Sequence, residues 1–487
     1  MRIKYIASIF EIIFKYLGIV VLFPILVSFY YHEFASIIPF LTASFISFGL
    51  SLILRIFTRG LNNNINDIKK NEGLFIVAAS WITACIIAAV PYLFYGMTPI
   101  DALFEAASGI TTTGASICSG VDYPRTAYFW RSFTQWLGGM GIIVLFIAIL
   151  PQLAVAGRQM FFAELPGPTE EKFTPRIRNT ASALWKIYAI LTAVEMIILK
   201  CLGMPMFDAV CNSLSTLSAG GFSPNSHSIM GYHSIPIVWV VMFFIFLSGV
   251  NFNLQYKAWK NFDILSIFKS EEFRVYLGLF LGISTLVAVS LYMNDNYGIF
   301  SSITHAGYQV ISIMTSTGSS SADYIQWSFI TKVILFLAVF TGGCASSASG
   351  GIKIARWILI FKVMKNELKR VLHPNAILNV KLDNNIVSRD ILSQMIMFLC
   401  FYVGFVVISI VILALLEQNI SIGLSASISS IGNIGPGFDA IIGPMASYET
   451  LHPISKFVLT CDMIIGRLEL IPFLVMFQKD FWNFRFE

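Results

Sequence analysis

The stretch Asp101–Ser116, DALFEAASGITTTGAS, joins a short run of helix-forming residues to three threonines and a glycine. Asp101 can accept from the free N–H groups of a helix start, and Pro99 suits the turn just before it. Thr111–Thr113 favour extended backbone, and Gly114 permits a positive φ that a β-branched residue would resist. Backbone carbonyls that line a narrow passage can replace the water around a cation. The stretch therefore predicts an ion-coordinating loop that enters a membrane and turns back.

A stretch of this type occurs four times in the chain. In each copy, the last glycine lies thirteen positions after the first residue. Internal repeats of this kind decide an architecture, and the shared spacing favours them over four unrelated loops rich in Ser, Thr and Gly. The four copies are Asp101–Gly114, Asp208–Gly221, His305–Gly318 and Ile422–Gly435.

The composition indicates a polytopic membrane protein. Of the 487 residues, 56% are hydrophobic and 12% are charged, whereas an average soluble domain is about 25% charged. The seven cysteines contain no C-x-x-C pair, so they are expected to be buried thiols. The apolar run Ile12–Tyr31 has the length of a membrane span rather than of a cleavable signal.

Apolar runs divide the chain into two leading helices and four units, each made of a span, a re-entrant stretch and a second span. We predict an all-α polytopic membrane protein with about ten transmembrane helices and four re-entrant pore helices around a pseudo-fourfold axis. The predicted divisions are 1–60 for the leading helices and 61–157, 158–260, 261–370 and 371–487 for the units. The predicted spans are Ile6–Tyr31 with a kink at Pro24, Ala35–Phe57, Leu74–Tyr95, Trp130–Leu153, Leu184–Leu202, Ile235–Leu254, Tyr276–Tyr292, Phe329–Phe361 with an interruption, Leu392–Leu416 and Phe457–Phe477.

Basic residues collect in the linkers between the units. The positive-inside rule then places the linkers and both termini in the cytoplasm, and the re-entrant stretches enter from outside. Irregular backbone at membrane depth must be buried in protein or line water, so four such stretches favour a shared pore. The linkers carry Arg59, Lys69, Lys70, Arg158, Lys172, Arg176, Arg178, Lys257, Lys260, Lys269, Arg274, Lys362, Lys365, Lys369, Arg370, Lys381 and Arg389, and the opposite side carries chiefly Arg125, Arg131, Lys200 and Lys456.

The four loops contain TTTGAS, AGGFS, STG and NIGPG in turn. This pattern resembles the Trk/Ktr/HKT superfamily of potassium transporters, and the two leading helices resemble its TrkH branch. The resemblance covers essentially the whole chain. It implies a potassium uptake subunit of the bacterial inner membrane, with a channel-like pore, K⁺ as the transported ion, and no bound cofactor or other metal.

The resemblance also implies a selectivity filter with one key glycine in each loop and the preceding carbonyls as ligands. In the second loop Gly220 is an alternative key glycine, although the spacing favours Gly221. Because the four loops differ, a looser filter than one of four identical strands is expected. The implied filter residues are Thr112, Thr113 and Gly114; Ala219, Gly220 and Gly221; Ser316, Thr317 and Gly318; and Asn433, Ile434 and Gly435.

The second span of unit three breaks at TGGCASSASGGIK, Thr341–Lys353. Each glycine in a helix costs roughly 1 kcal/mol, so this segment is expected to be irregular. The resemblance implies that it acts as an intramembrane gate below the filter; the alternative is a close helix crossing through small residues. A phosphate-binding loop is disfavoured because Ile352 precedes Lys353. The predicted gate glycines are Gly342, Gly343, Gly350 and Gly351.

Arg467 lies in the last predicted span, where a charge costs at least ~2.5 kcal/mol and normally faces a cavity or a partner. The resemblance implies that it points into the pore below the filter as a positive barrier. The alternative is packing against Asp462 or Glu469, whose spacings do not suit a same-face helical pair. Glu105 is expected to hydrogen-bond neighbouring backbone. His227, His233 and His305 are expected to be loop or helix-start residues, not metal ligands.

The leading function is conductive potassium uptake, and the alternative is an H⁺- or Na⁺-coupled symporter with alternating access. Symporters usually show inverted repeats, whereas these four units run in one direction, which favours a pore. An intramembrane enzyme is disfavoured, because neither G-x-S-x-G nor H-E-x-x-H occurs. The resemblance implies a homodimer on a separate cytosolic, TrkA-like ring of nucleotide-binding regulatory subunits. The basic linkers predict contact with anionic lipid, and no nucleic acid is expected.

Overall fold

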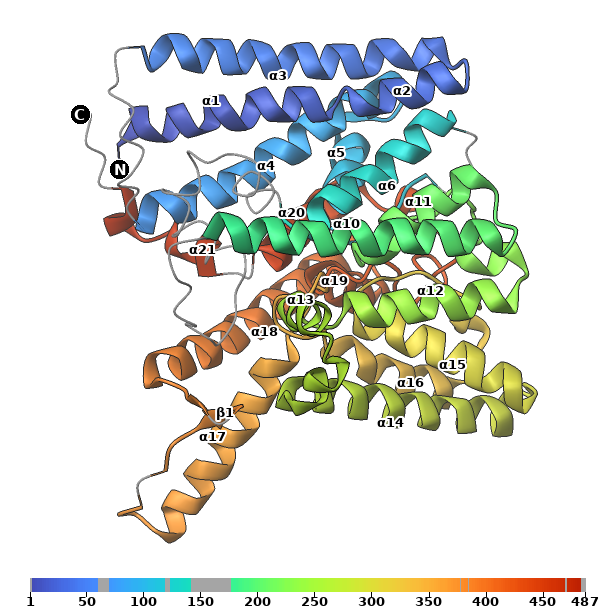
Figure 1. Cartoon of the computed structure of the whole chain (residues 1–487). Helices are drawn as coiled ribbons and strands as arrows, with labels where there is room; N and C mark the ends of the chain where they lie inside the picture. Colours follow the sequence, from blue (N-terminus) through green and yellow to red (C-terminus); the bar gives the residue numbers. More distant parts are fainter. Residues whose placement is uncertain are drawn as a thin grey trace.

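The computed structural model describes residues 2–59, 70–118, 123–141, 177–376, 378–383, 385–468 and 471–482. In this part of the chain nearly all regular structure is helical (Figure 1), apart from a small hairpin of β1 (Lys381–Leu382) and β2 (Asn385–Ile386). Six of its helices are long and apolar enough to cross a membrane, and one bent pair of helices would add a seventh span.

The leading part of the chain forms two antiparallel spans at one edge of the bundle (Figure 1). The first is α1 (Ile3–Val20) continued by α2 (Phe23–Tyr30), and the second is α3 (Ile37–Phe57). The helix is interrupted at residues 21–22, and Pro24 lies in the first turn of α2, where its missing N–H removes no helical bond. Serine hydroxyls of α3 donate to three carbonyl oxygens of α1 and hold the two spans together.

Four units of the same construction follow. Each has a long first helix, a short helix that ends four residues before the repeat glycine, and a second helix. In chain order the units are α4 (Lys70–Phe94), α5 (Pro99–Ile110) and α6 (Arg125–Gly139); α10 (Ile177–Cys201), α11 (Met206–Leu217) and α12 (Ile235–Ser248); α14 (Glu271–Asn294), α15 (Ile299–Met314) and α16 (Phe329–Leu337); and α18 (Arg389–Glu417), α19 (Ile420–Ile431) and α20 (Pro453–Arg467).

At three of the four junctions between units, the second helix of one unit packs on the short helix of the next unit. Helix α6 packs on α11, α12 packs on α15, and α20 packs on α5, which joins the last unit to the first. The short helices α5, α11 and α19 therefore lie inside the bundle, while α1, α3 and α14 lie at its edges (Figure 1). This arrangement explains why most residues of the short helices are buried although the helices are too short to span a membrane.

Two predicted spans are shorter than expected. The prediction of a continuous span over Ile235–Leu254 is wrong: α12 ends at Ser248, and the chain bends by 100° into α13 (Phe252–Asn261). The side chain of Asn251 caps α13 by accepting from the amides of Asn253 and Leu254, so a new helix starts there. The last predicted span, Phe457–Phe477, also divides, because α20 ends at Arg467 and α21 (Ile471–Val475) follows.

The predicted interruption of unit three is confirmed. After α16 and the 3₁₀ turn η6 (Ala338–Phe340), the chain is irregular until α17 (Ile354–Leu372), which projects from the bundle (Figure 1). Residues 142–153 of the second predicted span of unit one, and the linker residues Arg158, Lys172 and Arg176, lie outside the described residues. The remaining short turns are η1 (Phe34–Ser36), η3 (Ser228–Tyr232), η4 (Ile264–Lys269), η5 (Tyr324–Gln326), η7 (Tyr448–Thr450) and η8 (Lys479–Trp482).

The two described ends of the chain lie on the same side of the bundle. Arg2 forms an ion pair of 2.9 Å with Glu72 at the start of α4. The ring of Phe75, one turn further along α4, lies 5.8 Å from the ring of Trp482. A chain that crosses a membrane an even number of times, as in the predicted architecture, has both ends on the same side.

Candidate functional site

The four repeat glycines share one backbone conformation. All four lie in the left-handed region, with φ of +81° for Gly114, +78° for Gly221, +76° for Gly318 and +99° for Gly435. The residue two positions earlier in each loop is also left-handed: Thr112, Ala219, Ser316 and Asn433 have φ between +52° and +57°. Gly220 does not have a positive φ. The spacing therefore identified the correct register for the second loop, with Gly221 equivalent to the other three glycines.

The same glycines bring the four loops together around one centre. A Cβ built on Gly435 would lie 2.5 Å from the carbonyl oxygen of Thr113. The other three glycines approach the next loop in the same way, and in each case the oxygen belongs to the residue before the next glycine. A Cβ on Gly114 would overlap the carbonyl oxygen of Gly220, one on Gly221 that of Thr317, and one on Gly318 that of Ile434. Each loop thus contacts the next, and the fourth closes the ring on the first.

A serine six residues before each glycine anchors the turn into the loop. Its carbonyl oxygen accepts from the amide of the residue before the glycine, at 2.8–2.9 Å in all four loops. The amide of Thr113, for example, donates to Ser108. Our sequence reasoning missed this serine, although its spacing to the glycine is the same in every copy and was open to inspection. The four serines are Ser108, Ser215, Ser312 and Ser429.

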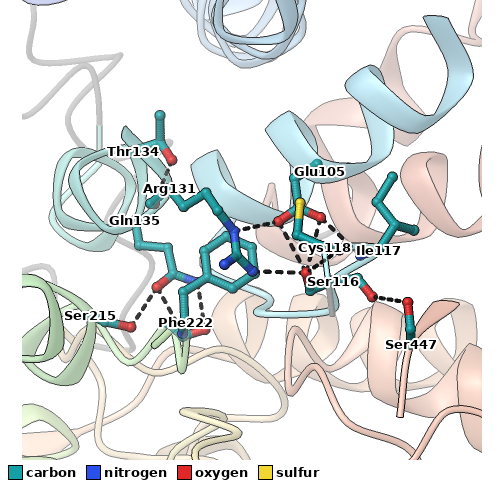
Figure 2. A network of polar contacts seen from close by, with 11 residues as sticks. Glu105, Ser116, Ile117, Cys118, Arg131, Thr134, Gln135, Ser215, Phe222 and Ser447 are labelled. Atoms are coloured by element: carbon teal, nitrogen blue, oxygen red, sulfur yellow. Dashed lines mark hydrogen bonds and ion pairs between the residues drawn. The ribbon is translucent and has the colours of Figure 1, made fainter. Parts of the chain in front are cut away.

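Buried polar groups behind the loops hold the first two in place (Figure 2). Glu105, which is fully buried in α5, forms a 2.7 Å ion pair with Arg131 of α6 and accepts from the amide of Ile117 at 3.0 Å. Arg131 also donates to the hydroxyl of Ser116 at 2.8 Å, and its guanidinium lies 4.2 Å from the ring centre of Phe222. The bond from Glu105 to neighbouring backbone was predicted; the ion pair was not, because Arg131 belongs to another helix.

The ring of loops separates two hollows. A cavity of about 380 Å³ lies on the side where the short helices begin and is lined by Gly114, Gly221, Gly318 and residues that follow them. A smaller cavity of about 60 Å³ lies on the other side and is lined by Gly350, Gly351, Lys353 and Arg467, among others. We call the first the mouth cavity and the second the inner cavity.

The irregular segment Thr341–Lys353 lies directly beneath the ring. The amide of Gly350 donates to the hydroxyl of Ser316 at 2.5 Å. A Cβ on Gly350 would lie 2.7 Å from the carbonyl oxygen of Gly432, in the fourth loop. Glycine is required at this position because the segment touches two loops at once. The alternative of a close helix crossing does not describe this segment, which has no helical residues between η6 and α17.

Three further contacts tie this segment to its surroundings. The amide of Cys344 donates to the carbonyl oxygen of Gly249 at 2.9 Å, where α12 ends. The amide of Ala345 donates to the carboxylate of Glu272 at 2.6 Å, at the start of α14. The ammonium of Lys353 donates to the segment's own Ser349 carbonyl at 2.7 Å. The segment is therefore held at several points by elements of units two and three.

Arg467 joins this segment to the first unit. It is the last residue of α20, not a residue in the middle of a longer span as predicted. Its guanidinium donates to the carbonyl oxygens of Ala348 at 3.1 Å and of Gly138 and Gly139 at 2.8 and 3.1 Å. Arg467 thus bridges the segment and the end of α6 on the wall of the inner cavity. Of the two alternative partners, Asp462 accepts from Ser409, and Glu469 lies outside the described residues.

Two of the three histidines predicted at loops or helix starts are found there, whereas the prediction is wrong for His305, which lies inside a helix. His227 and His233 flank the turn η3, and His305 lies in α15 with its Nδ1 3.1 Å from the hydroxyl of Ser321. In the described part of the chain, no group of three or more His, Cys, Asp and Glu side chains is arranged to hold a metal ion. The arrangement that could coordinate a cation is instead the ring of backbone carbonyls.

Four inserted loops that meet around one centre, with a cavity on each side, are the arrangement expected of a membrane transport protein. The TrkH family, described as cation transport proteins, matches residues 50–483, and this chain belongs to that family. The predicted resemblance and the prediction that the protein is not an enzyme are both confirmed by this match and by the names of its relatives.

The relatives are similar over most of their length. The chain is 36% identical to the Trk system potassium uptake protein TrkH of Salmonella typhimurium over 424 residues, which cover 86% of this chain and 87% of the relative. It is 31% identical to TrkH of Vibrio parahaemolyticus over 99% of this chain and the whole relative. The crystal structure of the potassium transporter TrkH from Vibrio parahaemolyticus matches 99% of this chain with a TM-score of 0.88 and 29% identity. The predicted fold is confirmed by this match.

Proposed function

We propose that this chain is a potassium uptake subunit of the bacterial inner membrane and that K⁺ crosses through the ring of loops. The named relatives are potassium uptake proteins, and they match this chain over most of its length. The observation that carries the proposal is the closed set of glycine–carbonyl contacts. Carbonyl oxygens around a single file can replace the hydration shell of K⁺. The proposed filter comprises Thr112, Thr113, Gly114, Ala219, Gly220, Gly221, Ser316, Thr317, Gly318, Asn433, Ile434 and Gly435.

The segment Gly342–Gly351 and Arg467 form the gate in this proposal. Gly350 lies against the third and fourth loops, so the segment covers the inner face of the ring. Arg467 ties that segment to α6, and its positive charge on the inner cavity wall opposes the entry of a cation. The gate opens when the bonds of Arg467 to Ala348 and to the end of α6 are broken together.

A conductive pore is favoured over an H⁺- or Na⁺-coupled symporter. Helix α6 packs on the short helix α11, α12 on α15 and α20 on α5, always in the same sense, without the inverted pairing that alternating access usually employs. The irregular segment Thr341–Lys353 below the ring suits a gate that opens one face while the ring stays in place. Single-channel steps with a linear current–voltage relation in a bilayer would support the pore, and a fixed ion stoichiometry would overturn it.

The proposal also includes the orientation of the chain in the membrane and its partner proteins. We place both termini in the cytoplasm, which agrees with the two described ends lying on one side. The names of the relatives place them in a Trk system, which supports a subunit that works with other Trk components. In our proposal the chain forms a homodimer on a separate, TrkA-like ring of nucleotide-binding subunits. Membrane lipid contacts its basic linkers, and it binds no nucleic acid.

Uptake into liposomes tests this function. Purified protein is reconstituted, and the influx of K⁺, Rb⁺ and Na⁺ is followed at matched protein density, with empty liposomes as the control. The proposal predicts saturable K⁺ and Rb⁺ influx that exceeds Na⁺ influx. Equal influx of all three ions, or none beyond that of empty liposomes in the presence and absence of the regulatory ring, would overturn it.

A further inference from the structure

Gln135 of α6 binds three polar groups of the second loop (Figure 2). Its amide nitrogen donates to the carbonyl oxygen of Gly220 at 2.6 Å. Its amide oxygen accepts from the hydroxyl of Ser215 at 2.6 Å and from the amide of Phe222 at 3.2 Å. The side chain is fully buried, so these bonds do not compete with bulk water. The bonds also fix the orientation of the Gln135 amide. Its oxygen must face the two donors, Ser215 and Phe222, so its nitrogen faces the carbonyl of Gly220.

The Gly220 oxygen belongs to the ring of four carbonyls. It is the oxygen that a Cβ on Gly114 would overlap. The equivalent oxygens are those of Thr113, Thr317 and Ile434, and within the described residues they accept no hydrogen bond from another protein group. The second loop therefore differs from the other three at this level, since its oxygen is already bound to an amide from outside the ring.

This contact also explains why the second loop has two glycines in succession. A Cβ on Gly220 would overlap the side chain of Gln135. The equivalent positions in the other loops are Thr113, Thr317 and Ile434, which carry branched side chains. Gly221 is required by its positive φ and its contact with the third loop, whereas Gly220 leaves room for the amide of Gln135.

We infer that Gln135 is a selectivity-determining positioning residue, which holds the Gly220 carbonyl toward its side-chain amide and leaves three uncommitted oxygens for the ion at that level. This inference rests on the proposed function. Discrimination between K⁺ and Na⁺ depends on the number and strength of the coordinating carbonyls. K⁺ is larger than Na⁺ and is best surrounded by a larger number of oxygens, so committing one of the four carbonyls to Gln135 lowers the preference for K⁺ over Na⁺ below what four free oxygens would provide.

The test compares Gln135→Met with Gln309→Met. Gln309 is a matched control because it is also fully buried, in α15, and donates to a loop carbonyl at 2.9 Å, that of Ala322, which lies beyond the ring. Both substitutions remove a buried amide that donates one hydrogen bond, at similar side-chain volume. Influx of K⁺ and Na⁺ is measured in liposomes, and thermal unfolding of each variant is recorded.

We expect Gln135→Met to raise the K⁺/Na⁺ influx ratio by about fivefold, the change that one hydrogen bond supports, and Gln309→Met to leave the ratio unchanged. Should Gln135→Met fail to fold, Ser215→Ala removes one of the bonds that orient the amide, and a smaller rise is expected. The inference is overturned if the ratio stays at the wild-type value in whichever of these two variants folds, or if Gln309→Met shifts it equally. Wild-type protein without K⁺-selective influx would overturn the proposed function itself.

Discussion

Gly435 of the fourth loop faces the carbonyl oxygen of Thr113 in the first, and a Cβ on the glycine would lie 2.5 Å from that oxygen. This contact joins residues from opposite ends of the chain and completes the ring. Position 435 requires glycine for two reasons: its φ is +99°, and the backbone of another loop approaches it closely.

Gly435→Ala is expected to reduce the K⁺/Na⁺ influx ratio by tenfold or more, because the new methyl group must displace the Thr113 oxygen by a distance large on the scale of ion coordination. The control is Gly203→Ala, since Gly203 has a similar φ of +93° but nothing within 4 Å of its Cβ position. Liposome influx measures both. If the two variants behave alike, backbone strain and not displacement of the carbonyl explains the effect.

Arg467→Ala should increase basal K⁺ influx in the absence of regulatory subunits by roughly tenfold or more, because hydrogen bonds from a charged group contribute about 1.5–3 kcal/mol each. The variant Arg467→Lys distinguishes the effect of the positive charge from that of the hydrogen bonds that join two elements. A lysine keeps the positive charge but lacks the fork that reaches Ala348 and the end of α6 together. An intermediate influx is expected. Wild-type influx in Arg467→Lys would show that charge alone closes the pore, and wild-type influx in Arg467→Ala would remove Arg467 from the gate.

Glu272→Ala should loosen the gate segment, because its carboxylate accepts from the amide of Ala345 and that amide would then be buried without a partner. We expect higher basal influx and a loss of about 1–3 kcal/mol in the free energy of unfolding. The neighbour Glu271 is a control, since it forms only a partly exposed ion pair with Lys362, and Glu271→Ala should cost at most about 1 kcal/mol. Equal effects from the two substitutions would argue against a specific role of Glu272.

Arg131→Met should destabilise the protein by about 3–5 kcal/mol, because it leaves the Glu105 carboxylate buried without its partner. The double variant Glu105→Gln/Arg131→Met should be less damaged than the sum of the two single variants. Thermal unfolding in detergent measures the cycle. The exposed pair Glu367–Arg370 is the reference, and Glu367→Ala should change stability by less than about 1 kcal/mol. Additive single effects would show that the buried pair is not coupled.

Much of the architecture was predictable because it depends on local pattern. Span length follows from the thickness of a bilayer, and the repeated glycine spacing places each short helix and its loop in register. The register of the second loop followed from spacing alone, and the backbone of Gly221 agrees with it. The sequence did not predict the bend after Ser248, because the apolar run continues through it. Asn251 caps α13 only because the chain turns there, and hydropathy does not show that turn.

The amino-acid sequence by itself determined the order of the repeated units, the four loops and the glycine in each, since these depend on hydropathy, helix breaking and the freedom of φ at glycine. Only the tertiary structure decided how the loops are supported. The bonds of Arg131 to Glu105, Gln135 to Gly220 and Arg467 to Ala348 each join a helix to a different element of the fold. Such pairs depend on the rotation and depth at which helices pack, and neither quantity is contained in the spacing of residues along one helix.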